Sequence, residues 1–405
     1  MDNLTHTIVG LAVGEVIHRS LSAEPTAAAH TTRHRLLLTA CAAASNFPDL
    51  DLVLVKLLPN PLGYLLHHRG HTHTLLLEIP QALLLCALLW LLWPAARRLL
   101  RDSRAACAGL ALSVIAGFLL HIAMDGLNSY GIHPFYPFDM RWRYGDLVFI
   151  VEPVFWVGAG APLLMGLQRR WLRLACATAL ALVLAACALV GLLHWASLLL
   201  LAAIGAAVAI ASADGRGRAG LVTGLGLGLA FIGVQALGSG AARTMLLEDM
   251  VLRAPGARLV DAALTAYPAN PLCWNYAAIE RDSGDDYHVR RGVLSLAPGL
   301  LPVASCPAGL SGPVALAPAS AIALQSDDSA SLSALRRRAT SDCWMNAWLR
   351  FARTPLLSGD SVSDLRFSNG VAANFTTIDL DRYKGRGCPA PLPPWAQPRA
   401  DLLAP

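Results

Sequence analysis

Residues 67–90 read HHRGHTHTLLLEIPQALLLCALLW, and this stretch decides the fold. Four histidines occupy its first seven positions, and an apolar run that we place at 74–94 follows at once. About 20 apolar residues are enough for a helix to cross the hydrocarbon core of a bilayer. The stretch therefore predicts a membrane span with imidazoles at its N-terminal end. Three interpretations of the histidines stay open: an ion pathway, a metal site, or an accident of a solvated loop.

Similar apolar runs recur through the first 240 residues. Of the 405 residues, 55% are hydrophobic and only 15% are charged, whereas soluble domains average about 25% charged residues. A secretory signal would give a single run near the start, so we predict a mainly α, polytopic membrane helical bundle with about six long spans. The predicted spans are 74–94, 106–125, 147–167, 172–193, 195–212 and 219–239, and two short N-terminal helices at 4–17 and 36–47 precede them.

The sequence becomes more polar from about residue 240, where charges, prolines and turns replace the long apolar runs. A tail of this length is enough for one soluble domain. We therefore predict a membrane-embedded helical domain over 1–240 and a soluble α+β domain over 241–405. The elements expected in the tail are a helix at 240–266, a hairpin of strands 273–280 and 286–296, a helix at 332–352, and strands at 362–369 and 374–381. The residues expected in its core are Trp274, Tyr276, Trp344 and Trp348.

The cysteines divide between the two regions. Five of the nine lie in apolar segments, where a free thiol behaves as a small hydrophobe. The remaining four, Cys273, Cys306, Cys343 and Cys388, lie in the tail. An even number in an extracytoplasmic domain permits one or two disulfides. Four cysteines allow three pairings, and the sequence leaves the choice open.

Arginine clusters mark the ends of the apolar runs, at 97–104, 169–173 and 214–218, with a fourth cluster in the loop 18–35. Because positive charge marks the cytoplasmic side of membrane segments, we place these loops inside. Alternation of the spans then places HHRGHTH and the C-terminal domain outside. The net charge of +5 follows from these loops, so we predict no nucleic-acid partner.

The predicted topology gathers most ionisable residues of the first 160 positions at the outer face. His121 and Asp125 lie four residues apart on one helix and share a face. This spacing can place an imidazole and a carboxylate on one metal ion. Asp49 and Asp51 lie two residues apart, and in an extended segment they would point in opposite directions. One of the two carboxylates would then be a metal ligand, and the other would be a partner of that site.

Convergent histidine and aspartate side chains favour zinc, manganese or iron over calcium, which prefers oxygen ligands alone. We expect a divalent metal, zinc or alternatively manganese. The candidate metal ligands are His6, Asp49, His68, His73, His121 and Asp125. The candidate catalytic residues, as further ligands, orienting groups or a general base, are Asp51, Asp146 and Glu152. We expect His67 and His71 to be solvated neighbours of this site.

Simpler explanations exist for single members of the set. A lone histidine such as His6 near a helix end is often an interfacial or hydrogen-bonded residue. The pair Asp49 and Asp51 could accept hydrogen bonds from the backbone of a loop. A carboxylate inside an apolar run, such as Asp125, is harder to explain because burial without a partner is costly. The metal-site interpretation is stronger for the whole set, because the topology that gathers it was built from arginines and apolar lengths alone.

Five ordered blocks within residues 1–160 resemble the YdjM family of bacterial inner-membrane, metal-dependent hydrolases: MDNLTHTIVG, SNFPDLD, HHRGHTH, HIAMDGLNSYG and GDLVFIVEPVFW. The resemblance is specific at HRGHTH, which fits the family pattern HRGxTH with His71 at the variable position, and at HxxxD followed by NSYG. It implies a multipass membrane protein and a divalent-metal hydrolase. The residues that it implicates are His6, Asp49, Asp51, His68, His73, His121, Asp125 and Asp146. Glu152 stands where the family is expected to have an aspartate, which keeps the carboxylate.

A fainter similarity favours a phosphoester substrate. The ordered histidines and aspartates followed by HxxxD are similar to zinc-dependent phospholipase C and the related single-strand nucleases, although their later HxxxE pattern is not clearly present. We therefore predict a hydrolase in the bacterial cytoplasmic (inner) membrane that acts at the outer face on a small-molecule or lipid-linked phosphoester. The alternatives are a non-catalytic metal-binding or transport protein, and a structural or sensory protein whose tail binds a partner. Almost no ionisable residues occur in the spans of 147–239, which counts against a transporter.

Overall fold

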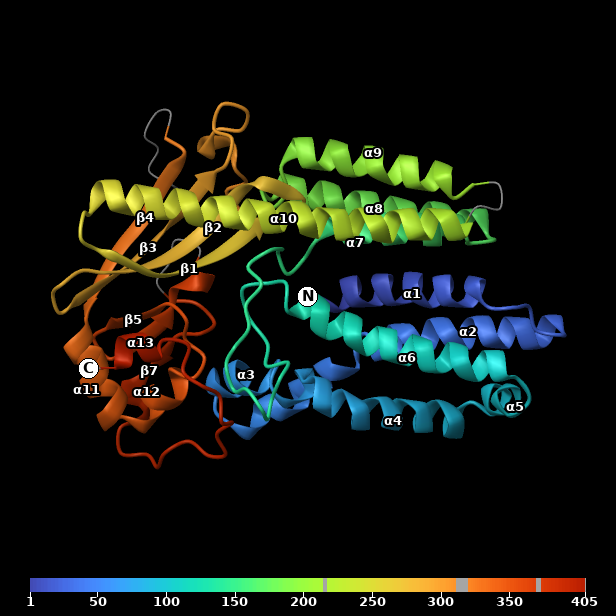
Figure 1. Cartoon of the computed structure of the whole chain (residues 1–405), viewed down its shortest axis with the longest axis horizontal. Coiled ribbons are helices and arrows are strands. Elements are labelled where there is room, and N and C mark those ends of the chain that lie inside the picture. The colour runs from blue at the N-terminus through green and yellow to red at the C-terminus, as the bar shows by residue number, and fades with distance from the viewer. Residues whose placement is uncertain (214–216, 311–319, 369–372, 405) are drawn as a thin grey trace.

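The computed structural model describes residues 1–213, 217–310, 320–368 and 373–404. It is mainly helical, with an antiparallel α+β region at the C-terminal end, as the sequence predicts. The helices lie side by side in one elongated bundle, and the C-terminal strands and short helices form a second body at one end of it (Figure 1). The helices of the bundle are α1 (Asn3–Ser20), α2 (Ala27–Ala44), α3 (Leu62–His67), α4 (Leu75–Leu92), α5 (Pro94–Asp102), α6 (Arg104–Asp125), α7 (Pro153–Met165), α8 (Arg170–Leu189), α9 (Trp195–Ala211) and α10 (Gly217–Arg253).

Among the described residues, five helical segments are long and apolar enough to cross a membrane. They are α4, α6, α8, α10 and the segment Ala27–Leu57, which joins α2 to the 3-10 helix η1 (Phe47–Leu57). The predicted span at 147–167 is shorter than expected, because α7 has 13 residues. The span predicted at 195–212 agrees with α9 to within one residue, although at 17 residues α9 is a shorter apolar helix than the five segments above. Helix α7 begins only at Pro153, where the side chain of Glu152 caps it.

The two N-terminal helices are longer than the sequence predicts, with 18 residues each. Polar residues that we assigned to the loop 18–35 instead continue the helices, so that only residues 21–26 connect them. Asp2 caps α1 and Thr26 caps α2 by accepting hydrogen bonds from backbone N–H groups. The prediction of a short second helix at 36–47 was therefore wrong, because it belongs to a segment long enough to cross a membrane.

Helix α10 joins the two bodies. It runs for 37 residues, so the domain boundary predicted at residue 240 falls inside a continuous helix. The predicted helix at 240–266 is wrong beyond Arg253, because Pro255 and Gly256, with a φ of +101°, end the helix. Residues after this turn form the first strand of the sheet (Figure 1).

The described part of the tail contains two antiparallel sheets. The first has the order β1–β2–β3–β4, and β2 pairs with β3 as the predicted hairpin, with Tyr276 opposite Gly292. The second has the order β5–β6–β7. The predicted helix at 332–352 is broken at Asp342, whose side chain caps a second helix. The strands are β1 (Arg258–Tyr267), β2 (Asn270–Arg281), β3 (Asp286–Ser295), β4 (Ile322–Ser331), β5 (Pro355–Ser358), β6 (Ser361–Asp364) and β7 (Ile378–Asp379), and the helices are α11 (Leu332–Ser341), α12 (Cys343–Trp348) and α13 (Ala400–Leu403).

The four aromatic residues predicted for the core of the tail are buried, but they belong to two clusters. Trp274 and Tyr276 pack with α10 against the first sheet. Trp344 and Trp348 pack between the second sheet and α3, which belongs to the bundle. Two disulfides, Cys273–Cys306 and Cys343–Cys388, settle the pairing that the sequence left open.

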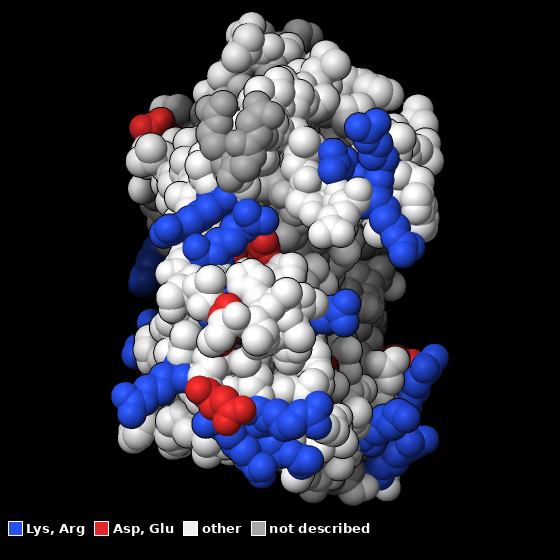
Figure 2. Space-filling view, turned by 90° about the vertical axis from the view of Figure 1, so that its right-hand side faces the viewer, with Lys and Arg blue, Asp and Glu red and all other residues white. Residues whose placement is uncertain are grey.

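Basic side chains gather at the end of the bundle opposite the C-terminal body (Figure 2). The connections α1–α2 and α7–α8, the end of α9, the start of α10 and the short helix α5 all lie at this end (Figure 1). The exposed arginines of these segments are Arg19, Arg35, Arg98, Arg101, Arg104, Arg169, Arg170 and Arg218. The arginine clusters of the sequence thus form one basic end of the molecule.

Helices α2 and α6 approach closely at Gly117. A Cβ atom on Gly117 would lie 2.6 Å from the carbonyl oxygen of Cys41 and 2.5 Å from Cβ of Ala44. Both contacts are too short for any residue other than glycine without a shift of the helix axes. This contact lies one turn before His121. It therefore fixes the position of the polar end of α6 along the axis of the bundle.

We predict that Gly117→Ala lowers the free energy of unfolding by about 1–3 kcal/mol, the usual effect of overpacking a dense interior. The measurement is the midpoint of thermal unfolding of the purified protein in detergent. Gly233→Ala on α10 is a matched control, because no atom lies within 4 Å of its added Cβ. The control is expected to be neutral or slightly stabilising, since alanine favours helices over glycine. Equal destabilisation of both variants would contradict the packing argument.

Candidate metal centre

The candidate ligands lie where the bundle meets the C-terminal body. Helix α6 carries His121 and Asp125 in its last two turns. Asp49 and Asp51 lie in η1, not in an extended segment as predicted, because Pro48 starts a 3-10 helix there. The short 3-10 helix η2 (His71–His73) ends the HHRGHTH turn immediately before α4.

The HHRGHTH turn is held by Asp51. This carboxylate accepts hydrogen bonds from Nδ1 of His68 at 3.0 Å, from the backbone N–H of Arg69 at 2.9 Å and from the hydroxyl of Thr72 at 2.9 Å. Arg69 has a φ of +57°, an uncommon conformation for a residue with a side chain, which such contacts must stabilise. Thr74 then caps α4, so the turn leads directly into the apolar helix.

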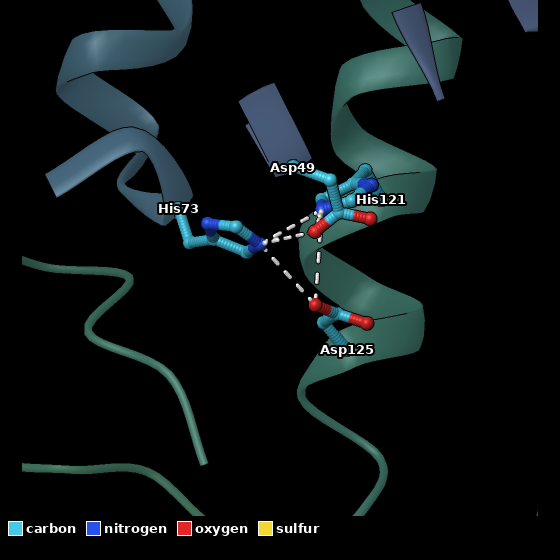
Figure 3. A group of neighbouring side chains, drawn as sticks. All are labelled: Asp49, His73, His121 and Asp125. Carbon is cyan, nitrogen blue, oxygen red and sulfur yellow. Dashed lines mark hydrogen bonds and ion pairs between the residues drawn. The ribbon is translucent and has the colours of Figure 1, made fainter. Parts of the chain in front are cut away.

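Four side chains from three separate segments point toward one another: Asp49, His73, His121 and Asp125 (Figure 3). Their ligand atoms all lie within 4.8 Å of each other. Nε2 of His73 lies 2.9 Å from Nε2 of His121, 3.3 Å from Oδ2 of Asp125 and 3.4 Å from Oδ1 of Asp49. Nε2 of His121 lies 3.7 Å from each of the two carboxylates. We call these four residues the first cluster.

This donor set fits a divalent metal. Tetrahedral zinc with bonds of about 2.0–2.1 Å separates neighbouring donor atoms by about 3.3 Å, close to the separations in the first cluster. Nδ1 of His121 donates to the carbonyl oxygen of Ser45 at 2.7 Å. This hydrogen bond leaves Nε2 of His121 as the free lone pair that faces the other donors, which is the usual arrangement of a metal-binding histidine.

A second cluster contains Asp49, Asp51 and His68, whose ligand atoms also lie within 4.8 Å of each other. Asp49 belongs to both clusters. Burial lowers the pKa of His68 in spite of its hydrogen bond to Asp51, so its ring is neutral and can serve as a ligand. One shared carboxylate between two such clusters resembles the arrangement of sites that hold two metal ions a few ångströms apart.

The electrostatics of the first cluster favour a cation. Burial lowers the pKa of His73, but its hydrogen bonds to Asp49 and Asp51 outweigh this effect and raise the pKa above the usual value. A positive charge on this ring is therefore stabilised by the carboxylates around it. The same carboxylates would stabilise a bound metal ion when the ring is neutral.

His6 contacts the first cluster without belonging to it. Its Nε2 lies 3.1 Å from Oδ1 of Asp125, and its ring stacks on that of His121 with the centroids 4.2 Å apart. Its other nitrogen, Nδ1, is buried without a hydrogen-bond partner among the described residues. Of the six predicted ligands, five thus lie in the two clusters, and His6 packs against them.

Arg69 is a site residue that the sequence interpretation missed. Its side chain is buried, and its Nε lies 3.0 Å from Oδ2 of Asp125. A terminal nitrogen donates to Oδ1 of Asn128 at 2.9 Å, and the guanidinium lies over the ring of Tyr130. The amino group of Met1 also pairs with Asp125. The position of Arg69 inside HRGHTH is the signal in the sequence that could have identified it.

Asp146 lies apart from both clusters. Its carboxylate forms two hydrogen bonds of 2.9 Å with the guanidinium of Arg353 and also pairs with Arg243 on α10. Arg353 in turn binds Asp261 on β1 at 2.7 Å. Asp146 therefore connects the loop after α6 to the C-terminal body, rather than to the metal ligands.

Glu152 also lies apart from the clusters. It caps α7, and its Oε1 accepts hydrogen bonds from the backbone N–H groups of Val154 and Ala269. Complete burial raises the pKa of Glu152 to about 8. The side chain thus joins α7 to the β1–β2 turn of the C-terminal body.

The C-terminal body also covers the two histidines expected in solvent. His67 is buried with 6% exposure, and the ring of His71 packs against those of Tyr136 and Trp395. Trp395 stacks on His133 and donates a hydrogen bond to the carbonyl oxygen of Leu66 at 2.7 Å. The expectation for His67 was wrong because the sequence does not indicate that a distant segment closes over this turn.

Comparisons with known proteins agree with a membrane family. The family model described as YdjM inner membrane protein matches residues 1–235, more than half of the chain. The chain is 27% identical over 157 residues to the "Uncharacterized protein YfhP" of Bacillus subtilis (strain 168), a match that covers 39% of this chain and 43% of that protein. No solved structure matches.

We predict that the buried carboxyl of Glu152 makes the folded protein less stable as the pH rises from about 4.5 to about 8. A carboxyl whose pKa is raised from 4.5 to about 8 on folding binds its proton more tightly in the folded state. The free energy of unfolding therefore falls by at most about 1.4 kcal/mol per pH unit between these values and levels off above them. Glu152→Gln removes this dependence.

The measurement is the difference in unfolding free energy between Glu152→Gln and the wild type, taken in detergent at pH values from 5 to 9. Titration of the histidines cancels in this difference. The variant is expected to gain stability relative to the wild type as the pH rises. A difference that does not change with pH would contradict the buried, protonated carboxyl.

Proposed function

The chain belongs to the YdjM inner membrane protein family, and from this premise we propose that it is a membrane-bound, metal-dependent hydrolase that acts on a phosphoester. One observation carries the proposal: two clusters of carboxylate and imidazole donors share Asp49 at the end of the membrane bundle. Ionisable groups beside a membrane span are costly and tend to serve a function.

In this proposal, the first cluster holds one divalent ion, and Asp49, Asp51 and His68 hold a second. The mixture of neutral imidazoles and carboxylates suits zinc, with manganese as the alternative. Ions in such sites act as Lewis acids on phosphoryl oxygens and lower the pKa of water. Asp51 also positions the HHRGHTH turn through its three hydrogen bonds.

Arg69 supplies positive charge beside the donors. A planar guanidinium binds phosphoryl oxygens through two parallel hydrogen bonds, and in a site without bulk water its charge stabilises negative charge that develops during the reaction. Asp125 and Asn128 already orient the group. Asp146 and Glu152 are assigned a structural role, since their contacts lie with the C-terminal body.

The proposed location is the extracytoplasmic face. The arginine-rich end of the bundle (Figure 2) is the end that the positive-inside rule assigns to the cytoplasm. The two clusters and the C-terminal body lie at the opposite end, where the headgroups of the outer leaflet would be. A lipid-linked or small-molecule phosphoester is the substrate that suits a hydrolytic site at this depth.

A non-catalytic metal-binding protein is the second candidate, and one observation favours it. His73, His121 and Asp125 are completely buried, and Asp49 is only 9% exposed. Structural metal sites are usually closed by protein ligands, whereas catalytic sites keep one position open. Metal content and turnover therefore have to be measured separately.

We predict that His73→Ala and Asp125→Ala lose the bound metal and reduce phosphodiester hydrolysis at least about a hundredfold, because each removes a first-cluster ligand. Metal is measured by mass spectrometry on protein purified in detergent, and turnover with bis(p-nitrophenyl) phosphate. His71→Ala is the matched control in the same turn, since its ring packs on Tyr136 and Trp395 instead of the clusters.

The outcomes separate the candidates. Metal and turnover that are retained in His71→Ala but lost in the other two variants support the hydrolase. Stoichiometric metal without turnover on any phosphoester would favour the second candidate. A folded wild-type protein that binds no zinc or manganese would eliminate both.

The proposed orientation predicts which loops react with an impermeant maleimide in intact cells. Arg141→Cys, at a side chain with 70% exposure in the loop after α6, should be labelled from outside. Arg170→Cys, exposed at the start of α8, should react only after the membrane is permeabilised. The wild type, with its five free cysteines, gives the background. The reverse pattern would place the clusters at the cytoplasmic face.

A further inference from the structure

A cavity of about 370 Å³ lies between the bundle and the C-terminal body. Its walls come from Tyr64 in α3, from the loop after α6, from β1 to β4, and from residues 365–368 and Phe375. Its volume falls within the range of small-molecule binding sites. The C-terminal body therefore does not only cover the bundle, but forms a partly open pocket with it.

The cavity borders the candidate metal centre. Tyr64 lines the cavity, and its ring lies 4.9 Å from that of His68, between centroids. Asn128 also lines it and accepts the hydrogen bond from Arg69. One layer of side chains thus separates the cavity from the second cluster and from the guanidinium that pairs with Asp125.

Arg291 on β3 is a buried cation in the cavity wall. It is 6% exposed, and its guanidinium donates to the hydroxyl of Ser326 and to the carbonyl oxygen of Ser368, both at 3.1 Å. No carboxylate among the described residues lies within 4 Å of it. Its neighbour Arg290, outside the cavity, pairs with Glu280 at 3.2 Å and Asp327 at 2.5 Å. Asp328 acts on the charge of Arg291 only from a distance. A buried charge without a directly paired carboxylate is expensive, and this distinguishes Arg291 from Arg290.

Two further donors in the wall have no partner among the described residues. Nδ2 of Asn128, a residue with 4% exposure, and Nε2 of Gln325 are both buried without a hydrogen-bond acceptor. The second arginine of the wall, Arg366, is by contrast fixed by Asp364 at 2.6 Å. The two unsatisfied groups of the described cavity wall are therefore both N–H donors, and Arg291 adds a buried positive charge beside them.

We propose that this cavity binds a phosphate group, with Arg291, Asn128 and Gln325 as its hydrogen-bond donors. A phosphate offers several acceptor oxygens and a negative charge, which satisfies all three donors together. If the bound phosphate is the phosphoester group of the substrate, the proposal rests on the proposed function. The phosphate source is either an anionic lipid headgroup or a free phosphate.

The test uses the full-length protein in detergent. Calorimetry measures binding of inorganic phosphate, and native mass spectrometry measures retention of phosphatidic acid against phosphatidylcholine. Arg291→Gln is expected to weaken binding about tenfold to a hundredfold, as expected when a charged hydrogen bond to phosphate is lost. Gln325→Leu should weaken binding less. Arg290→Gln is the matched control, because its side chain lies outside the cavity, and should bind like the wild type.

Metal content is measured on the same samples, so that this proposal and the hydrolase proposal can fail separately. Binding that depends on Arg291 but not on Arg290 supports the phosphate site, whether or not the protein turns over a phosphoester. Selective retention of phosphatidic acid identifies a lipid source, and binding of inorganic phosphate alone identifies a free one. Undiminished binding in both Arg291→Gln and Gln325→Leu, or no phosphate binding by the wild type, would overturn the assignment.

Discussion

The burial of the Asp125 carboxylate is the constraint on which the site depends. This group is completely shielded from solvent at the end of an apolar helix, where an uncompensated charge would be very costly. Its oxygens are approached by the rings of His6 and His73 and by the guanidinium of Arg69. These partners come from α1 and from the HHRGHTH turn, so that compensation of one charge brings three distant parts of the chain together. A divalent ion in the first cluster would complete this compensation.

A second charge network determines how the C-terminal body sits on the bundle. Arg353 is buried between Asp146, from the loop after α6, and Asp261, from β1. Arg243 pairs with the same Asp146 from α10, the helix that joins the two bodies. Removing one member of such a buried network leaves the others without compensation. This charge network therefore fixes the orientation of the C-terminal body on the bundle. It also holds the first sheet in position as one wall of the cavity.

The sequence predicted the elements of the bundle better than their ends and contacts. Apolar length and arginine position gave the spans and the basic end, because both are local properties of the chain. The pattern at His121 and Asp125 also led to the right face of α6. The extended conformation predicted for Asp49 and Asp51 was wrong because Pro48 starts a 3-10 helix there. The surroundings of Asp146 and of the HHRGHTH turn were missed for another reason. Arg353, which binds Asp146, and Trp395, which donates to the carbonyl oxygen of Leu66, lie more than 200 residues away from these partners, and spacing does not reveal such contacts.

Asn128 connects the two halves of this arrangement. Its carbonyl oxygen orients Arg69 beside Asp125. Its amide nitrogen is buried without a partner among the described residues, and the residue lines the cavity. A side-chain amide cannot rotate to satisfy one atom without moving the other. A ligand oxygen that accepts from this nitrogen would therefore hold the guanidinium in its present position. In the proposed phosphate site, this one residue would couple recognition in the cavity to charge placement at the clusters, and both would require the C-terminal body to be docked.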